Sequence, residues 1–237
     1  MYIYVFDDFT QQNKYQKSIQ QISKRLTDLG LNGKIIQLGI SKNISSSIED
    51  EIRRGAKTIV AVGNDQTTLK TLNAIAMSQS DEKHCLCLGV IPLEPRESHL
   101  SELLGISNIN DACEILLARR LKIFNAAAFG QNFFLFRAAA PADGLLLDLD
   151  KNFIVQPAKD EIVEIINDPN KDWQGDKKLV LKIKHKNSES LFSFREAIAV
   201  NQKTPIILDG SLPIALPARI SMEGQKIKII VGKGRVI

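Results

Sequence analysis

The stretch Ala56–Ala76 is the part of the sequence that most restricts the fold. It contains an apolar run rich in β-branched residues, Thr58–Val62, which ends at Gly63, and a helical pattern follows over Thr67–Met77. A buried strand that passes within a few residues into a helix is typical of a βα unit. Because strands joined through helices lie parallel, this unit predicts a parallel sheet covered by helices.

The same alternation of strand-like and helical patterns extends over residues 1–124. Further strand-like runs occur at Tyr2–Phe6, Lys34–Ile40 and Cys85–Ile91. Helical patterns are expected over residues 19–29, 45–55, 67–77, 100–104 and 110–120. This order predicts an N-terminal, Rossmann-like α/β domain of the nucleotide-binding type over residues 1–124.

The remainder, residues 125–237, lacks helical periodicity. Short strand-like runs alternate with turn residues such as Asp168–Asn170, Asp209-Gly210 and Glu223-Gly224. This pattern predicts an all-β sandwich domain, joined to the first domain near residues 121–128. Asp209-Gly210 between two apolar runs is also the usual signal of a type I′ hairpin turn. Because edge strands of a small sandwich can pair between copies, a homodimer is one arrangement we consider.

Composition excludes several classes of protein. The chain has 31 Lys and Arg against 27 Asp and Glu, a net charge of +4, and neither half forms a basic arm. Nucleic acid is therefore not an expected partner. No apolar run is long enough for a membrane span, and the first residues do not resemble a signal peptide, so the cytoplasm is the expected compartment. Three cysteines fit reduced thiols, and His84, Cys85 and Cys87 lack a fourth ligand, so no metal site is predicted.

The turn after the Thr58–Val62 strand has two interpretations. The first helical N–H groups and the positive end of the helix dipole point toward one spot there, which suits a phosphate. Phosphate-binding turns usually contain several glycines, however, and this one has only Gly63. The other interpretation is a structural strand-to-helix turn with Asp65 or Thr67 as the N-cap.

Several segments resemble one family in the same order and at similar spacing. Gly63–Thr67 resembles an altered form of the Gly-Gly-Asp-Gly-Thr motif of diacylglycerol kinases and NAD kinases. Leu88–Leu93 and Leu104–Ile106 are similar to the diacylglycerol kinase strand and the end of the helix that follows it. Asp209–Ser211 resembles that family's Asp-Gly-Glu hairpin. The match covers most of the chain, and residues 137–200 match least.

The resemblance implies a mechanism and a set of site residues. Members of the family use ATP and Mg²⁺ to phosphorylate a hydroxyl group of a lipid or of NAD. By this resemblance, Asp209 would be the catalytic residue that accepts the hydroxyl proton. The nucleotide would be bound by the turn residues and by the loop after the fourth strand, and the residues implied are Gly63, Asn64, Asp65, Gln66, Thr67 and Arg96. A lipid substrate would also bring the protein to the membrane surface.

The sequence departs from the family pattern at each part of this site. Asn64 and Gln66 stand where the family has glycine, and a positive φ at Gln66 would cost about 1–2 kcal/mol. Glu94–Ser98 replaces a glycine-rich loop, and its glutamates would repel phosphate unless Arg96 or Mg²⁺ intervened. Ser211 replaces the glutamate of the hairpin.

Two functions from different classes therefore remain open. One is a lipid kinase of the diacylglycerol kinase type, which transfers phosphoryl from ATP with normal or impaired activity. The other is a relative that has lost catalysis and acts as a ligand-binding or scaffold protein. An NAD kinase-like activity ranks lower, because that group also has an Asn-x-Glu motif for the nucleotide ribose, which we do not find at a suitable place.

Overall fold

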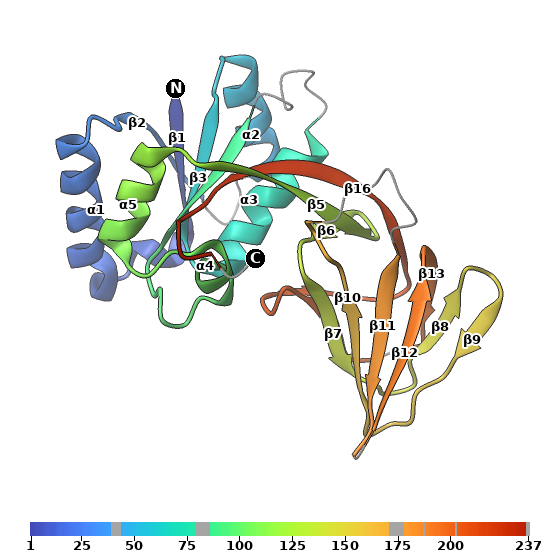
Figure 1. Ribbon diagram of the computed structural model, residues 1–237. Helices are drawn as coiled ribbons and strands as arrows, with labels where there is room; N and C mark the ends of the chain where they lie inside the picture. Colours follow the sequence, from blue (N-terminus) through green and yellow to red (C-terminus); the bar gives the residue numbers. More distant parts are fainter. Residues whose placement is uncertain (39–43, 79–85, 171–177, 187, 202, 236–237) are drawn as a thin grey trace. The chain divides into compact units, whose positions relative to one another are not determined.

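The computed structural model describes residues 1–38, 44–78, 86–170, 178–186, 188–201 and 203–235 (Figure 1). It divides into two compact units, residues 1–123 with 227–237, and residues 124–226. The elements of the first unit are β1 (Tyr2–Phe6), η1 (Asp8–Gln11), η2 (Asn13–Tyr15), α1 (Gln16–Asp28), β2 (Gly33–Gln37), α2 (Ile44–Arg53), β3 (Thr58–Gly63), α3 (Asp65–Met77), β4 (Cys87–Pro92), α4 (His99–Leu104) and α5 (Ile109–Ala118). The chain continues through β5 (Leu121–Phe129), β6 (Asn132–Phe134), β7 (Arg137–Pro141), β8 (Leu146–Leu149), β9 (Phe153–Val155), β10 (Ile162–Ile166), β11 (Leu179–Lys184), β12 (Glu189–Phe194), β13 (Glu196–Val200), β14 (Ile206–Leu208), β15 (Leu212–Ile214) and β16 (Ala218–Ile230).

The first unit is built on a parallel sheet in the order β2-β1-β3-β4. Helices α1 and α5 pack together on one face, and α2 and α3 pack together on the other (Figure 1). Every residue of β3 and β4 is buried. Since both faces of this sheet are covered, its central strands are apolar throughout rather than alternating. The predicted Rossmann-like architecture is confirmed.

The strand order also fixes where a ligand would be expected. From β1 the chain passes through α1 to β2 on one side, and it then returns through α2 to β3 on the other side of β1. The carboxyl ends of β1 and β3 therefore lie at a topological switch point, where the two connections diverge. In open α/β sheets, ligands bind in the crevice outside the carboxyl ends of the strands at such a point. Asp7 and Asn64 are the residues that immediately follow these two strands.

The second unit consists of two sheets around one apolar core. One sheet is antiparallel and has the order β12-β11-β10-β7-β14-β15. In the other, β16 pairs with β13, β13 with β8, and β8 with β9, all antiparallel, while β5 pairs with β16 and β6. The strand β11 shows the expected alternation, because Leu179, Leu181 and Ile183 are buried and contribute to the core. The all-β character predicted for this part is confirmed.

The C-terminal segment belongs to the first unit, whereas the sequence placed all of residues 125–237 in the second. The strand-like run Lys226–Val231, which the sequence places in the second domain, overlaps the end of the long strand β16, and Ile229 pairs in parallel with Leu88 of β4. Apolar residues at the end of β16 are buried in this way beside the central sheet. The predicted domain boundary followed the end of the helical pattern, so it assigned this returning segment to the second domain.

Some predicted bounds shift. Helix α3 begins at Asp65 rather than Thr67, and strands β7 and β9 were not predicted. The ends of two predicted strands, at Ile40 and Cys85, lie outside the described residues. No helix in the described part of the chain is both long enough and apolar enough to cross a membrane.

Candidate functional site

The turn between β3 and α3 lies at the carboxyl edge of the parallel sheet, and Asn64 is its N-cap. The backbone of Asn64 is extended, with φ −105° and ψ −175°, and its Oδ1 accepts a hydrogen bond of 3.0 Å from the Thr67 N–H. The alternatives given by the sequence, Asp65 or Thr67 as the cap, are wrong. Asparagine is among the residues most favoured at this position, because its side-chain oxygen satisfies an N–H of the first turn. Gln66 is helical and has no positive φ, so the predicted backbone strain does not arise.

Gly63 is required by packing against the helix that follows it. A Cβ atom at this position would lie 2.5 Å from the Thr67 Oγ1 and 2.9 Å from the Thr67 Cβ. Such distances are shorter than ordinary van der Waals contact, so a side chain would push the first turn of α3 away from the end of β3. The glycine that matches the family motif is therefore explained by the approach of Thr67, with or without a phosphate nearby.

Thr67 joins α3 to the end of β1 at the switch point. Its side chain is fully buried, and its hydroxyl donates to Asp7 Oδ2 at 2.8 Å. The other oxygen of Asp7 accepts the N–H of Asp8 at 2.8 Å. One turn further along α3, the Lys70 Nζ lies 3.9 Å from Asp7 Oδ2. Sequence reasoning did not include Lys70, although its spacing of three from Thr67 puts both residues on the same face of the helix.

Asp65 joins the same turn to the loop after β4. One carboxylate oxygen accepts a hydrogen bond from the Ser98 hydroxyl, and the other accepts the N–H of Leu100 at 3.2 Å. Ser98 is itself the N-cap of α4, and its Oγ accepts the N–H of Ser101 at 3.0 Å. The carboxylate of Asp65 thus helps to hold the beginning of α4 and has an internal partner on each oxygen.

A third set of contacts neutralises Glu94. Its Oε1 accepts hydrogen bonds from the Tyr15 hydroxyl at 2.9 Å and from the Lys14 Nζ at 3.4 Å. The Lys14 ammonium lies 4.4 Å from the centroid of the Tyr15 ring. The pKa of Lys14 is raised, first by its hydrogen bond with Tyr15 and, to a smaller extent, by Glu94. Lys14, rather than Arg96, therefore pairs with Glu94, one of the two glutamates that were expected to repel phosphate.

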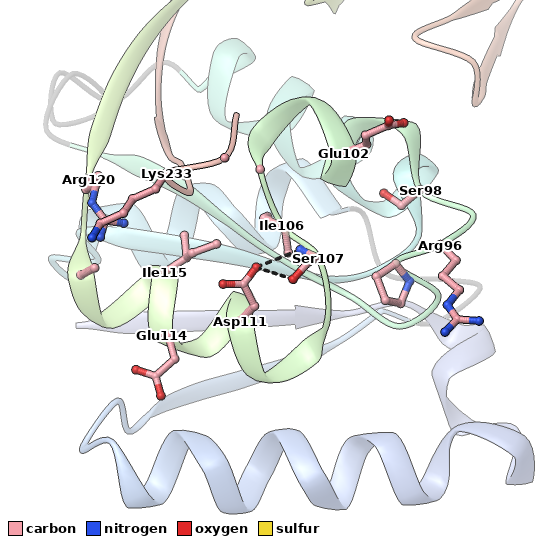
Figure 2. A pocket seen from close by; sticks show the side chains of 14 residues that line it. Arg96, Ser98, Glu102, Ile106, Ser107, Asp111, Glu114, Ile115, Arg120 and Lys233 are labelled. Carbon is pink, nitrogen blue, oxygen red and sulfur yellow. Dashed lines mark hydrogen bonds between the residues drawn. The ribbon is translucent and has the colours of Figure 1, made fainter. Parts of the chain in front are cut away.

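Arg96, the remaining predicted nucleotide contact, is exposed. It lines a pocket of about 790 Å³ that also includes Ser98. In Figure 2 it lies at the opposite end of the pocket from Arg120 and Lys233. No hydrogen bond or ion pair of Arg96 occurs among the described residues. Gln66 lies half-buried in the first turn of α3.

Asp209, the predicted catalytic residue, belongs to the second unit. Its side chain is 1% exposed, and its carboxylate accepts three backbone N–H groups, from Leu135 at 2.7 Å, Phe136 at 2.8 Å and Arg137 at 2.9 Å. The φ angles of Asp209 and Gly210 are +42° and +75°, which agree with the predicted type I′ turn. The carboxylate therefore fixes the β6–β7 corner against the β14–β15 hairpin.

Ser211 stands where the family has a glutamate, and it supplies no carboxylate. Its backbone N–H closes the hairpin turn by donating to the Leu208 carbonyl at 3.0 Å. Its hydroxyl is buried and has no hydrogen-bond partner among the described residues. The hairpin thus retains the shape expected from Asp209-Gly210 and lacks the second acidic group of the motif.

The described residues contain no group of three or more His, Cys, Asp or Glu side chains placed to hold a metal ion. Cys87 and Cys113 are buried free thiols, and Cys85 lies outside the described residues. Burial raises the pKa of the Cys113 thiol to about 11. Neither described cysteine is therefore a reactive surface nucleophile.

The residues at the carboxyl edge do suit the phosphates of a nucleotide in one respect. In the described part of the chain, no acceptor is found for the backbone N–H groups of Asp65 and Gln66, which are the first two of α3. These N–H groups and the helix dipole favour an anion, and the ammonium of Lys70 lies on the same helix. The Asp7 carboxylate has oxygen atoms of the kind that Mg²⁺ binds. Both of these oxygens already accept a hydrogen bond, from the Asp8 N–H and the Thr67 hydroxyl.

Comparison with known proteins supports the fold. No protein-family model matches the chain, and a search of curated proteins found no match. Among solved structures, a diacylglycerol kinase from Bacillus anthracis str. Sterne matches with a TM-score of 0.72 and 14% identity, over 100% of this chain and 98% of that one. Two further structures from the same organism match at 12% identity, with TM-scores of 0.72 and 0.73, over 99% of this chain and 98% of theirs. The chain therefore has the two-part fold of bacterial diacylglycerol kinase proteins, as its motifs predicted.

Proposed function

We propose that this protein is a diacylglycerol kinase-like protein that binds a nucleotide at the carboxyl edge of its first unit, and whose ATP- and Mg²⁺-dependent transfer of phosphoryl to a lipid hydroxyl is impaired. The observation that carries the proposal is the environment of Asp209. Its carboxylate is buried and accepts three backbone N–H groups, so it is not free to accept a proton from a hydroxyl.

Nucleotide binding is supported by the first turn of α3. The N–H groups of Asp65 and Gln66 are available to a phosphate, and Lys70 supplies a positive charge near the same turn. A bound Mg²⁺ would reduce the negative charge of the phosphates, as it does in phosphoryl transfer generally. The carboxylate of Asp65 holds the beginning of α4, and therefore would position this turn rather than act on the nucleotide directly.

The substitutions at the other parts of the motif weaken the case for fast catalysis. Phosphoryl transfer depends mostly on positioning and on charge stabilisation by groups that contact the phosphates. Pro95 has no backbone N–H to offer in the loop that replaces a glycine-rich one. Ser211 cannot replace a carboxylate as a base.

The second candidate is a fully active lipid kinase. It is favoured by the presence of Gly63, Asp65, Thr67 and Asp209 at the matching positions of a chain with this fold. Both candidate functions require the protein to bind a nucleotide, and they differ in the rate of phosphoryl transfer. They can therefore be separated by measuring binding and activity on the same preparation.

Thermal unfolding with Mg-ATP tests binding. A ligand present at 100 times its Kd stabilises the folded state by about 2.7 kcal/mol, which raises the Tm by roughly 5–10 °C for a chain of this size. We expect Lys70→Gln to reduce this shift. Lys24→Gln, an exposed lysine on α1 without an ion-pair partner among the described residues, is the matched control and should leave the shift unchanged. Absence of any shift at millimolar Mg-ATP would contradict nucleotide binding.

Incubation with labelled ATP, Mg²⁺ and either diacylglycerol or NAD tests turnover. The proposal expects product at a low rate or none, and a rate typical of kinases, lost in Asp65→Ala, would instead establish the active kinase. Gln66→Gly enlarges the space at the first turn while leaving the Asn64 cap intact. If the Gln66 side chain obstructs a phosphate, this variant should show a larger thermal shift with Mg-ATP than the wild type.

A further inference from the structure

A pocket of about 790 Å³ lies in the first unit, away from the Asp7–Thr67 contact (Figure 2). It is formed by α4, α5, the segment between them and the C-terminal residues that follow β16. Neither Asp7, Thr67 nor Lys70 lines it. It meets the carboxyl-edge loops only at one rim, through Pro95, Arg96 and Ser98.

The C-terminal segment is a fixed wall of this pocket. The N–H of Val231 donates to the Arg120 carbonyl at 2.9 Å, and the N–H of Gly232 donates to the Leu104 carbonyl at 2.9 Å. A Cβ at Gly232 would lie 2.1 Å from the Gly105 carbonyl oxygen, and one at Gly105 would lie 2.5 Å from the Arg235 N. Glycines on both sides of the contact therefore let the segment lie directly against the end of α4.

Two acidic side chains of the pocket already have partners. The Asp111 carboxylate accepts the N–H and the hydroxyl of Ser107, each at 2.9 Å. Glu114 forms an ion pair with Arg25 of α1. Glu102 is exposed at the opposite end of the pocket from Arg120 in Figure 2. The carboxylates of Asp111 and Glu114 thus already interact with other groups of the protein.

Three cations line the pocket, and two of them, Arg120 and Lys233, lie together at the end away from Arg96. No ion pair or side-chain hydrogen bond of Arg120 or Lys233 occurs in the described ranges. The Val231 N–H donates to the Arg120 carbonyl, and Lys233 follows Val231 by two residues in the chain. Figure 2 shows the side chains of Arg120 and Lys233 at the same end of the pocket. Beside them, Ile106 and Ile115, which are largely buried, form an apolar wall.

We propose that this pocket binds a small phosphate monoester, with its phosphate at Arg120 and Lys233 and an apolar or planar body against Ile106 and Ile115. Arg presents several N–H donors in a geometry that matches phosphate oxygens, and Lys adds a second positive charge, so the pair suits a dianionic group. A concave site with an apolar wall and a few convergent charged groups is the usual form of a small-molecule site. The phosphate could belong to a water-soluble molecule or to the headgroup of phosphatidic acid.

Binding is tested on the full chain with three probes. Inorganic phosphate and AMP represent water-soluble phosphates, and calorimetry measures their affinity. Vesicles of phosphatidylcholine with and without phosphatidic acid represent the lipid source, and co-sedimentation measures their binding. We expect AMP to bind more tightly than inorganic phosphate if the source is water-soluble, and only the vesicles with phosphatidic acid to bind if the source is the lipid headgroup.

Substitutions of pocket residues test whether the phosphate probe binds in this pocket. Arg120→Gln and Lys233→Gln should each weaken the probe that binds by about 10-fold or more, since each removes a charged hydrogen-bonding group. Gly234→Leu should also weaken it, because Gly234 lines the pocket and a Cβ there meets nothing within 4 Å, so a larger side chain can take up space that the ligand would need. Lys24→Gln, as the matched control, should change nothing. Circular dichroism and the Tm confirm that each variant is folded.

Three results would overturn the proposal. The first is that none of the probes binds the wild type. The second is that the Arg120→Gln/Lys233→Gln double variant binds as the wild type does. The third is that Lys70→Gln abolishes binding and the pocket variants do not, which would place the phosphate at the carboxyl edge. Because Lys70 and the pocket residues are separate sets, failure here is distinguishable from failure of nucleotide binding at the switch point.

Discussion

Replacing Asp209 should unfold part of the second unit rather than simply stop a reaction. Its carboxylate is the acceptor for the N–H groups of Leu135, Phe136 and Arg137, at 2.7–2.9 Å, and it is 1% exposed. In Asp209→Ala these three donors lose that acceptor inside the protein. The positive φ of 42° also becomes less favourable, because alanine tolerates it less well than aspartate.

The magnitude follows from these contacts. A hydrogen bond to a charged group contributes about 1.5–3 kcal/mol, so three of them set an upper range of about 4.5–9 kcal/mol. Water that enters the space left by the side chain can satisfy some of the donors, so we expect a loss of about 4 kcal/mol for Asp209→Ala. Asp209→Asn keeps one carbonyl oxygen and an acceptable residue for φ, and should lose about 2 kcal/mol. Total stabilities of about 5–15 kcal/mol make both effects large.

Urea denaturation and amide hydrogen exchange measure the effect. We expect fast exchange at Leu135, Phe136 and Arg137 in Asp209→Ala. In Asp209→Asn the amide nitrogen can replace Oδ2, so exchange should increase mainly at Leu135, whose N–H is bound to that atom. Asp160→Ala, an exposed aspartate of the second unit, is the control. A loss below about 1 kcal/mol for Asp209→Ala, with all three amides still protected, would refute the structural role. Loss of kinase turnover in Asp209→Asn without a change in stability would instead support catalysis.

Three further predictions concern the first unit. Asn64→Ala removes the acceptor for the Thr67 N–H and should lower the free energy of unfolding by about 1 kcal/mol in urea denaturation. Gly63→Ala places a Cβ 2.5 Å from the Thr67 Oγ1, and overpacking of this kind should cost about 1–3 kcal/mol, visible as a lower Tm. Burial raises the pKa of Cys113 from 9.0 to about 11, so its thiolate is about 100-fold scarcer at pH 8 than in the unfolded chain. Peptide mapping after iodoacetamide treatment should find Cys113 alkylated only when the protein is unfolded, and rapid labelling of the folded protein would contradict its burial.

The sequence predicted the fold well wherever one residue pattern implied one structure. The buried strand Thr58–Val62 and the helix after it could be recognised, because the central parallel strand is apolar throughout and the helix contains polar residues among its apolar ones. The destination of β16 could not be predicted. An alternating run such as Lys226–Val231 fits an edge strand of either unit, and only the pairing of Ile229 with Leu88 assigns its end to the first. Local periodicity does not contain that long-range information.

The sequence predicted where the candidate site residues lie in the sheet better than it predicted the contacts that each of them makes. The motif Gly63–Thr67 could be placed at the carboxyl edge of the parallel sheet, because residues that follow a central strand must lie there. Their partners come from elsewhere in the chain. Asp7 is 60 residues from Thr67, and Ser98 is 33 residues from Asp65. Roles that depend on such contacts, including the N-cap at Asn64 and the support of α4 by Asp65, could not be read from spacing alone.

The N-cap at Asn64 bears directly on how strongly this turn can hold a phosphate. In a turn made of glycines, a bound anion can accept several N–H groups of the first helical turn, and nothing else competes for them. Here the Asn64 side chain already accepts the Thr67 N–H, so the turn is satisfied in part without any ligand. A nucleotide would be left with the N–H groups of Asp65 and Gln66 and with the charge of Lys70. The asparagine that caps the turn therefore reduces the number of hydrogen bonds that a phosphate can form there. For the nucleotide site that we propose, this predicts weak binding as well as slow turnover.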